Sequence, residues 1–433
     1  MKKQKIAVIF GGNSTEYEVS LQSATAVLKN INSERFDILP IGINRAGDWF
    51  HYTGKYESIA NNTWFENSAE NCPVIVSQNC SQKGFFEFSQ NQCTLIGVDL
   101  VFPVLHGKNG EDGTLQGLFE LAGIPIVGCN TLSSALCMDK SRAHKLVSLE
   151  GISVPKSVTF NRFEQENAIK EIALNLTYPL FVKPVRAGSS FGITKVTEKE
   201  KLSAAIALAF EHDTEVIVEE AIDGFEVGCA ILGNDVLTVG RVDEIELSSG
   251  FFDYTEKYTL KTSQIHMPAR IDATTEKKIQ DTALRIYKAL GCSGFARVDL
   301  FLSANGNIVF NEVNTIWQDV YCTKGQPNCH HPYWVCRWNS EKFILREWQD
   351  TNQAIYCPYY WANLHGSACS RHYGSGRYCM RHVLCIKVKQ RQILPGLPQA
   401  YHEQTGSGAH EKTTRPCYAI RAKIALIYRA CSA

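Results

Sequence analysis

Residues 295–314 contain the feature that most constrains the fold, two apolar segments joined by Ala-Asn-Gly-Asn. An Asn-Gly pair between alternating apolar residues is a strong signal for a β-hairpin, because both turn positions tolerate a positive φ. We therefore interpret Asn305 and Gly306 as a two-residue loop, in which Ala304 pairs with Asn307.

This register gathers four polar side chains of the predicted hairpin. Counting back from the loop pairs Asp299 with Glu312 and Arg297 with Asn314. Because side chains alternate along a strand, all four lie on one face. Carboxylate and amide oxygens suit Mg²⁺, and an arginine beside them suits a phosphoryl group in transfer. For an isolated hairpin, an exposed ion pair is an equally good interpretation.

The composition is that of an ordinary globular protein. The chain has 433 residues, of which 44% are hydrophobic and 20% charged, enough for about two to four domains. The first apolar run, residues 6–10, stops at Gly11-Gly12 and is shorter than the core of a signal peptide. No apolar run has the length that spans a bilayer, so we expect a cytoplasmic protein without a membrane partner.

Charge is distributed unevenly along the chain. Residues 317–433 carry 15 Lys and Arg against 6 Asp and Glu, whereas residues 1–316 carry 29 basic and 38 acidic residues. The same 117 residues hold 9 of the 16 cysteines and 5 of the 7 tryptophans. We expect no nucleic-acid partner for the acidic part, and the tail needs a separate explanation.

The first 130 residues indicate an α/β unit. A buried strand over 5–10 leads through a glycine turn into a helix over 16–30, and such a helix start can bind an anion or small ligand. Glu16 lies in the first helical turn, where complementing the helix dipole is its simplest role. Further strands are predicted over 37–43 and 98–103.

A second glycine-rich loop, residues 105–117, follows the strand over 98–103 and contains His106. It lies at the edge where open α/β sheets bind ligands, although a lone histidine is more often structural. A helix over 114–122 and a strand over 125–127 complete the unit.

The central segment, residues 131–215, begins with a predicted helix over 131–151. A strand over 178–184 then carries Lys183 near its end and runs into a loop with Ser189 and Ser190. Backbone N–H groups and hydroxyls of such a loop can bind phosphate oxygens, with the lysine as a point charge beside them. A flexible turn is the alternative.

The next segment, residues 216–316, continues with strands over 215–222, 224–232 and 236–241 and a helix over 274–290. The edge after the first of these strands can give an adenine two backbone hydrogen bonds, and Glu219 or Glu226 can reach a ribose. The polar stretch 247–263 has the length of an active-site lid.

Taken together, these segments resemble the ATP-grasp superfamily, and within it the D-alanine–D-alanine ligases. Seven matches occur in order and cover residues 1–316 only. The matching segments are Phe-Gly-Gly-Asn-Ser-x-Glu-x-Glu-Val-Ser (10–20), His-Gly-x-x-Gly-Glu-Asp-Gly-Thr-Leu-Gln-Gly (106–117), Met-Asp-Lys (138–140), Lys-Pro-x-Arg-x-Gly-Ser-Ser-x-Gly (183–192), Asp-Tyr-x-x-Lys-Tyr (253–258), Gly-Phe-Ala-Arg-Val-Asp (294–299) and Asn-Glu-Val-Asn-Thr (311–315).

The resemblance implies a three-domain α/β ATP-grasp fold with the nucleotide between the central and C-terminal domains. The expected boundaries are an N-terminal substrate domain over 1–130, a central domain over 131–215, a truncated C-terminal domain over 216–316 and an atypical tail over 317–433. It also implies ATP and two Mg²⁺ or Mn²⁺ ions as cofactors, and a homodimer.

The resemblance further assigns roles residue by residue. Lys140, Lys183 and the loop with Ser189 and Ser190 are expected to hold the ATP phosphates, and Glu219 and Glu226 the adenosine. Asp299, Glu312 and Asn314 are the expected metal ligands. Lys257 and Arg297 are expected to contact the transferring phosphoryl group. Glu16, tied through Ser189 to Tyr258, is expected to bind the ammonium of the first D-alanine, and His106 to lie near its carboxylate.

The implied activity joins D-alanine to a second D-amino acid through an acyl phosphate, for peptidoglycan precursors. D-Alanine and D-serine, the latter typical of vancomycin resistance, are both open as second substrate. The segment around Phe251–Leu260 leans mildly to D-serine, and Lys257-Tyr258 argues against a D-lactate type.

The chain departs from the family after Ile316, where Trp317-Gln318-Asp319 replaces the expected Pro-Gly segment for the second substrate. The tail shows no sustained helical or strand period, and its cysteine spacing fits no zinc pattern. Two interpretations of the tail stay open. One is a basic, aromatic-rich module for nucleic acid, and the other is a change of reading frame near codon 317. An ATP- and Mg-binding homologue with impaired or lost catalysis is therefore the alternative function.

Overall fold

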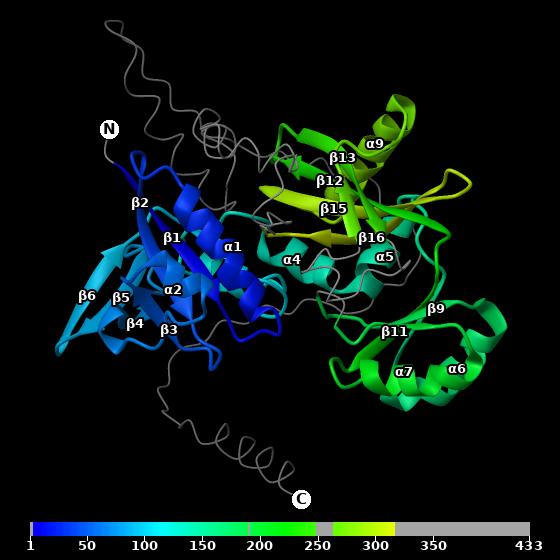
Figure 1. The fold of residues 1–433 in the computed structure, drawn as a ribbon, viewed down its shortest axis with the longest axis horizontal. Helices are drawn as coiled ribbons and strands as arrows, with labels where there is room; N and C mark the ends of the chain where they lie inside the picture. The colour runs from blue at the N-terminus through cyan, green and yellow to red at the C-terminus, as the bar shows by residue number, and fades with distance from the viewer. Residues whose placement is uncertain (1–2, 189–190, 248–262, 317–433) are drawn as a thin grey trace, which may run out of the picture. The chain divides into compact units, whose positions relative to one another are not determined.

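The computed structural model describes residues 3–188, 191–247 and 263–316. Their strands form three sheets, of seven, four and five strands (Figure 1). No helix in these three ranges is long and apolar enough to cross a membrane.

The seven-stranded sheet has the order β6-β5-β4-β3-β2-β1-β7, and β1 pairs in parallel with both β2 and β7. Its strands are β1 (Gln4–Gly11), β2 (Phe36–Ile43), β3 (Trp49–Tyr52), β4 (Asn71–Val76), β5 (Gly84–Ser89), β6 (Gln92–Gly97) and β7 (Leu100–Val104). The helices of this region are α1 (Tyr17–Asn30), α2 (Tyr56–Ala60), η1 (Ser68–Glu70) and α3 (Thr114–Leu121).

Strand β1 is buried on both faces, as its continuous apolar sequence predicts. Ile6 and Val8 pack in one core with Leu21 of α1, whereas Ile9 packs in another with Phe119 of α3. The C-terminal end of β1 is thereby fixed where the first glycine turn leads into α1. The predicted strand over 125–127 is wrong, because only an isolated bridge between Val101 and Ile126 forms there.

The four-stranded sheet is antiparallel, in the order β10-β9-β11-β8. Its elements are β8 (Ser157–Asn161), η2 (Arg162–Glu164), α6 (Gln165–Asn175), β9 (Leu180–Pro184), β10 (Thr194–Val196), η3 (Lys199–Lys201), α7 (Leu202–Ala209) and β11 (Glu215–Glu220). Ile172 of α6 and Ile206 of α7 share a core with Val182 and Val218 of the sheet. This sheet continues past residue 215, and our domain boundaries stay predictions.

The five-stranded sheet is antiparallel, in the order β14-β13-β12-β15-β16. Its strands are β12 (Gly224–Leu232), β13 (Thr238–Leu247), β14 (Ser263–His266), β15 (Phe295–Ser303) and β16 (Ile308–Asn314). Three helices pack on it, α4 (Thr131–Met138), α5 (Lys140–Leu149) and α9 (Ala273–Ala289). Val147 of α5 and Ile286 of α9 share a core with Val298 and Leu300 of β15.

The predicted single helix over 131–151 is wrong, because the chain breaks at Asp139. This residue is extended, with φ −88° and ψ 95°, and it ends α4 and caps α5. Its carboxylate accepts a hydrogen bond from the Arg142 backbone N–H at 2.9 Å, the usual N-cap arrangement. Lys140 is thereby fixed as the first residue of α5.

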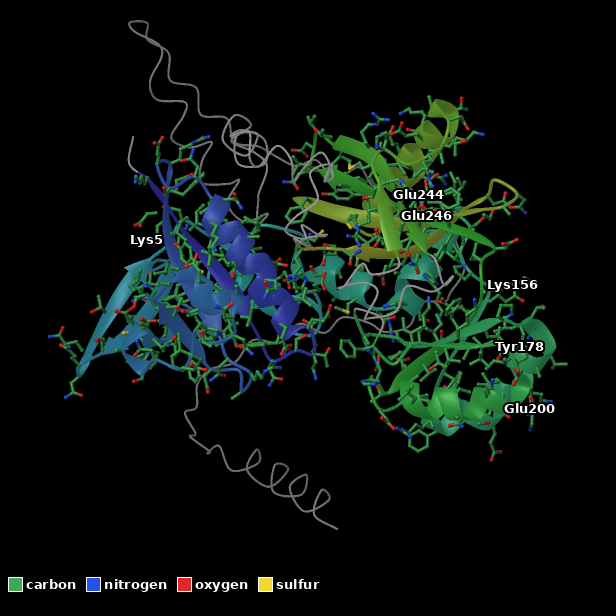
Figure 2. All side chains as sticks on the ribbon, in the orientation of Figure 1. Lys5, Lys156, Tyr178, Glu200, Glu244 and Glu246 are labelled. Atoms are coloured by element: carbon green, nitrogen blue, oxygen red, sulfur yellow. The ribbon has the colours of Figure 1, made fainter. Side chains whose placement is uncertain are left out.

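Arg270, which lies shortly before α9, forms ion pairs with two residues of β13 in the five-stranded sheet. Its guanidinium lies 2.5 Å from Glu244 and 3.1 Å from Glu246, two side chains that β13 presents and that Figure 2 labels. Two carboxylates on one guanidinium hold β13 in place. The same strand carries Asp243, which belongs to the site described below.

Candidate active site

The β15–β16 hairpin places its polar residues as the sequence predicts. Asp299 pairs directly with Glu312, and Arg297 with Asn314. Directly paired residues of an antiparallel ladder share a face, so the two carboxylates lie on the same side of the sheet. The predicted pairing at the site is therefore confirmed.

The route to this pairing differs from the prediction. The loop has three residues rather than two, because Ser303, not Ala304, bonds to Asn307, with its N–H donating to the Asn307 carbonyl at 2.9 Å. Among the three loop residues 304–306, only Gly306 has a positive φ, +82°. A β-bulge then inserts Asn311 into β16, so that Leu300 pairs with Phe310 while Asp299 pairs with Glu312. The extra residue cancels the error of one position at the loop.

Asp299 is the centre of a hydrogen-bonded cluster. Arg297 donates to both of its carboxylate oxygens at 2.7 Å, and the Asn314 amide nitrogen donates at 2.7 Å. Burial acts to lower the pKa of Arg297, but the carboxylates of Asp299, Asp243 and Glu226 outweigh it and raise the pKa above its usual value. The guanidinium is therefore a permanent charge on this face.

The three expected metal ligands form an all-oxygen donor set. Asp299 is buried, Glu312 is partly exposed, and the Asn314 side chain uses its nitrogen on Asp299, which makes its oxygen the candidate ligand atom. Mg²⁺ and Mn²⁺ prefer such oxygen ligands and complete their shells with substrate phosphate and water. No cluster of three or more His, Cys, Asp and Glu fit for a metal occurs in the described ranges. Because Mg²⁺ takes only one or two protein carboxylates where substrate phosphates complete its shell, two carboxylates and one amide are compatible with a metal that also binds the nucleotide.

A further carboxylate, Asp243, was not among the predicted site residues. Gly228 of β12 pairs with Asp243 on one side and with Asp299 on the other. A Cβ at Gly228 would lie 2.3 Å from the Asp243 carboxylate, so only glycine leaves room for that side chain. Desolvation raises the pKa of Asp243 to about 6, against the opposing charge of Arg297. The sequence signal was a glycine inside a strand, which often marks a close approach.

Lys140 reaches the same face from the start of α5. Its ammonium lies 3.3 Å from the Glu312 carboxylate and donates to the Ala187 carbonyl at 3.0 Å. Its backbone N–H donates to the Val185 carbonyl at 3.3 Å. Lys140 thus links β16, which carries two of the expected metal ligands, to the residues that lead into the serine-containing loop.

Lys183 and Glu219 form a buried ion pair between β9 and β11, at 2.6 Å. Burial acts to lower the pKa of Lys183, but Glu219, Glu312 and Glu226 outweigh it and raise the pKa. Burial acts to raise the pKa of Glu219, but the charges of Lys183 and Lys140 outweigh it and lower the pKa. Both groups therefore keep their charges, one expected at the phosphates and the other at the adenosine.

His144 and Asn311 connect these elements, and neither was among the predicted site residues. The His144 Nε2 atom lies 2.8 Å from the Asn311 carbonyl oxygen, and its Nδ1 lies 3.6 Å from Glu219. The Asn311 amide donates to Glu226 at 3.3 Å. The structure thus brings Glu226 to the bulge of β16.

Glu16 is buried at the start of α1 and makes no side-chain capping bond to that helix. Its carboxylate faces two glycines instead, because a Cβ at Gly107 would lie 2.1 Å from it and one at Gly188 2.6 Å. The adjacent His106 is also buried, with Nε2 3.3 Å from the Ser23 hydroxyl, and its carbonyl accepts from Ser14. The glycine-rich loop over 105–117 and the segment that leads into the serine-containing loop of the central region therefore meet at the Glu16 carboxylate.

One cavity lies between several of these groups. It is lined by Glu111, Cys137, Met138, Lys140, Ala187, Gly188, Glu312, Val313, Asn314 and Thr315. A predicted phosphate lysine, two predicted metal ligands and the glycine against Glu16 thus surround a single space. Glu111 also lines it and accepts from the Gly107 N–H at 2.8 Å, a role that the glycine-rich loop alone did not indicate.

Several predicted site residues lie outside the described ranges. They are Ser189, Ser190, Lys257 and Tyr258, together with residues 248–262 of the predicted lid and the tail over 317–433. Their roles, and both interpretations of the tail, stay predictions.

The fold and this cluster define an enzyme of the ATP-grasp class. Two family models match the chain, "D-ala D-ala ligase N-terminus" over residues 5–129 and "D-ala D-ala ligase C-terminus" over residues 146–317. The protein belongs to the D-alanine–D-alanine ligase family. The family match ends at the residue where the predicted departure begins.

Relatives include proteins named as D-alanine–D-alanine ligases and as vancomycin resistance proteins. A D-alanine–D-alanine ligase of Caldicellulosiruptor bescii is 45% identical over 321 residues, which covers 73% of this chain and 87% of that protein. The vancomycin B-type resistance protein VanB of Enterococcus faecalis is 46% identical, over 73% of this chain and 90% of that protein. The crystal structure of the VanG D-Ala:D-Ser ligase of Enterococcus faecalis has 70% identity and a TM-score of 0.70, over 80% of this chain and 97% of that one.

Proposed function

We propose that the protein joins D-alanine to a second D-amino acid with ATP, releasing ADP and phosphate, for peptidoglycan precursor synthesis. The observation that carries this proposal is the cavity between Lys140, Gly188, Glu312 and Asn314. Family membership supports the ATP-dependent ligation, and the comparisons lend nothing to the alternative with lost catalysis. We place the enzyme in the cytoplasm, as a homodimer, as the family resemblance suggests.

In the first step, a carboxylate oxygen of D-alanine attacks the γ-phosphorus of ATP, and ADP leaves. Glu16 holds the substrate ammonium, because its buried carboxylate is directed toward Gly107 and Gly188 by the two loops. Lys140 and Lys183 neutralise phosphate charge, which is the main requirement of phosphoryl transfer. Arg297 contacts the transferring group from the face it shares with Asp299.

In the second step, the amine of the second amino acid attacks the carbonyl carbon of the acyl phosphate. Phosphate leaves, the amine loses its proton, and a peptide bond forms. Water must be excluded at this step, because it would otherwise hydrolyse the acyl phosphate. His106 lies next to Gly107 and is our candidate for a contact to the first substrate.

Asp299, Glu312 and Asn314 would hold the divalent metal, which when bound neutralises charge shared by the phosphates and the leaving ADP. Arg297 orients Asp299 for this purpose by its two hydrogen bonds. Two ions are expected from the family, and Asp243 adds negative charge to the same face.

D-Serine is favoured as the second substrate by one specific observation. The chain is 70% identical to a protein described as a D-Ala:D-Ser ligase, whereas the D-alanine–D-alanine ligase of C. bescii is 45% identical. D-Alanine is the alternative. The choice is measurable from the mass of the dipeptide formed when both amino acids compete at equal concentration.

The test uses the full chain with ATP, Mg²⁺, D-alanine and D-serine. We expect phosphate release that requires D-alanine, and a D-alanyl-D-serine product identified by mass spectrometry. Asp299→Asn is expected to lower kcat/KM by about 100-fold or more, because it removes charge at the reacting phosphates. Asp281→Asn on the exposed face of α9, where the carboxylate pairs only with Lys277 on the same helix, is the matched control. Absence of D-alanine-dependent phosphate release in the wild-type chain would overturn the proposal.

A further inference from the structure

The bulge at Asn311 decides which side chains of β16 face Asp299. Near the loop, Leu302 pairs with Ile308 and Leu300 with Phe310. If that register continued without the bulge, Asn311 would face Asp299 and Val313 would face Arg297. Because side chains alternate along a strand, a shift of one residue would turn Glu312 and Asn314 to the opposite face.

The packing of β16 against the core shows the one-residue shift that the bulge introduces. Phe310 and Val313 are both buried in the core that contains Val298 and Leu300. Residues three apart on a regular strand point to opposite faces. The two side chains share a face only because the bulge adds one residue between them.

His144, a residue of α5, forms a hydrogen bond to the bulged residue Asn311 of β16. A bulged residue is left out of the sheet ladder, so its buried backbone groups need other partners. The Asn311 carbonyl accepts from His144 Nε2 at 2.8 Å, and the histidine is 4% exposed. The imidazole also packs edge-on against Phe310, with 5.4 Å between ring centres.

This geometry fixes the histidine tautomer. A carbonyl oxygen only accepts hydrogen bonds, so the proton of the neutral ring lies on Nε2. The other nitrogen, Nδ1, lies 3.6 Å from the Glu219 carboxylate, beyond hydrogen-bonding distance. Nδ1 and the Glu219 carboxylate are then both hydrogen-bond acceptors, which explains why they stay 3.6 Å apart. The ring donates its one N–H, on Nε2, to the Asn311 carbonyl.

We propose that His144 is a positioning residue: its hydrogen bond to the Asn311 carbonyl stabilises the β16 bulge and keeps Glu312 and Asn314 on the face of Asp299. The inference rests on the proposed function, because it takes these three residues as the metal ligands. Helix α5 would then position two parts of the site, the Lys140 side chain and, through His144, the bulge of β16.

The experiment compares His144→Met with His144→Gln in the full chain. Glutamine carries its amide nitrogen at about the position of Nε2, whereas methionine has similar size and no donor. The readout is the affinity for Mn²⁺ in the presence of ATP, measured by electron paramagnetic resonance of free Mn²⁺. We expect the methionine variant to bind Mn²⁺ about 10-fold or more weakly, and the glutamine variant within about twofold of wild type.

A second variant and a packing control keep the test decisive. His144→Asn retains a polar side chain too short to reach Asn311, and should bind Mn²⁺ as weakly as the methionine variant. Ile286→Val loosens the same core without touching the bulge, and should leave Mn²⁺ affinity unchanged. Thermal melting shows that each variant is folded.

The outcomes separate this inference from the proposed function. Wild-type Mn²⁺ affinity in His144→Met, together with loss of binding in Asp299→Asn, would overturn the positioning role and leave the ligands in place. Equal loss in the methionine and glutamine variants would show that the donor is not what matters, and would also overturn it. Absence of ATP-dependent Mn²⁺ binding in the wild-type chain would remove the ligand assignment and the inference together.

Discussion

The Lys183 ammonium and the Glu219 carboxylate lie 2.6 Å apart, and each is the nearest charge to the other in a buried site. The pair crosses between the two adjacent strands β9 and β11. Lys183 is expected at the ATP phosphates, so its charge must be present before nucleotide binds. Glu219 supplies the compensation that makes a buried, charged lysine tolerable.

Glu219→Gln should therefore destabilise the protein strongly. It leaves the Lys183 charge buried without a full partner, which typically costs about 3–5 kcal/mol. Glu198→Gln, which removes an exposed carboxylate paired with Lys201, should change the free energy of unfolding by less than about 1 kcal/mol. Urea denaturation of both variants measures the difference. Similar small effects in the two would show that the buried pair is not maintained in solution.

A pH-dependent contribution to stability is expected from His144. Burial is the main cause that lowers its pKa, and nearby Lys183 and Lys140 add to it, against Glu219 and the Asn311 carbonyl. Because the pKa of His144 is lower in the folded protein, there is a pH range in which the unfolded chain is protonated at this residue and the folded chain is not. Stability is therefore fully present above the usual value of 6.5 and is lost as pH falls toward the folded pKa.

The variant His144→Gln should remove that part of the pH dependence. The wild type should lose up to about 1.4 kcal/mol more per pH unit below 6.5 than the variant. Unfolding free energies between about pH 5 and 7.5 measure this difference. His212→Gln, at an exposed histidine, is the control. Parallel curves for wild type and His144→Gln would contradict the prediction.

The hairpin and the alternation along β15 were predictable from local rules, but the pairing of Asp299 with Glu312 was predicted correctly only because two deviations cancel. The loop is one residue longer than predicted, and the bulge at Asn311 adds one residue to β16. The bulge was not predictable from the apolar pattern, because Val309 and Val313 are both apolar and keep the two-residue period of a regular strand.

Other features depend on contacts that no local pattern contains. The pairing of Lys183 with Glu219 and the approach of Glu16 to Gly188 join segments far apart in sequence. The antiparallel extension β3–β6 was not among the predicted elements, because its short strands mix polar and apolar residues. The break at Asp139, in contrast, was readable, since an aspartate before a helical segment is a typical N-cap.

Gly107 and Gly291 separate the effect of a close contact from that of backbone strain. Both have a positive φ, +68° and +63°, but a Cβ would meet the Glu16 carboxylate only at Gly107, and nothing lies within 4 Å at Gly291. Alanine at either position should cost about 1–2 kcal/mol of stability from the backbone conformation.

Only Gly107→Ala should also raise the KM for the first D-alanine. Displacing the Glu16 carboxylate by about 1 Å misplaces the group that holds the substrate ammonium, an effect of about 10-fold to 100-fold. Steady-state phosphate release with varied D-alanine measures it, with Gly291→Ala as the matched control. An unchanged KM in Gly107→Ala would argue against Glu16 as the ammonium ligand.

Asp139 sets the position of Lys140 at the start of α5. Its carboxylate caps α5 and lies near two arginines, Arg142 and Arg186. Asp139→Ala should cost about 0.5–2 kcal/mol through the lost cap, whereas Asp139→Asn keeps an acceptor oxygen and should cost less. Because Lys140 is the first residue of α5, the alanine variant should also raise the KM for ATP. Urea denaturation and ATP titration of both variants test this. An alanine variant that loses stability but keeps the wild-type KM for ATP would show that Lys140 is held by its bonds to Val185 and Ala187 instead of by the cap.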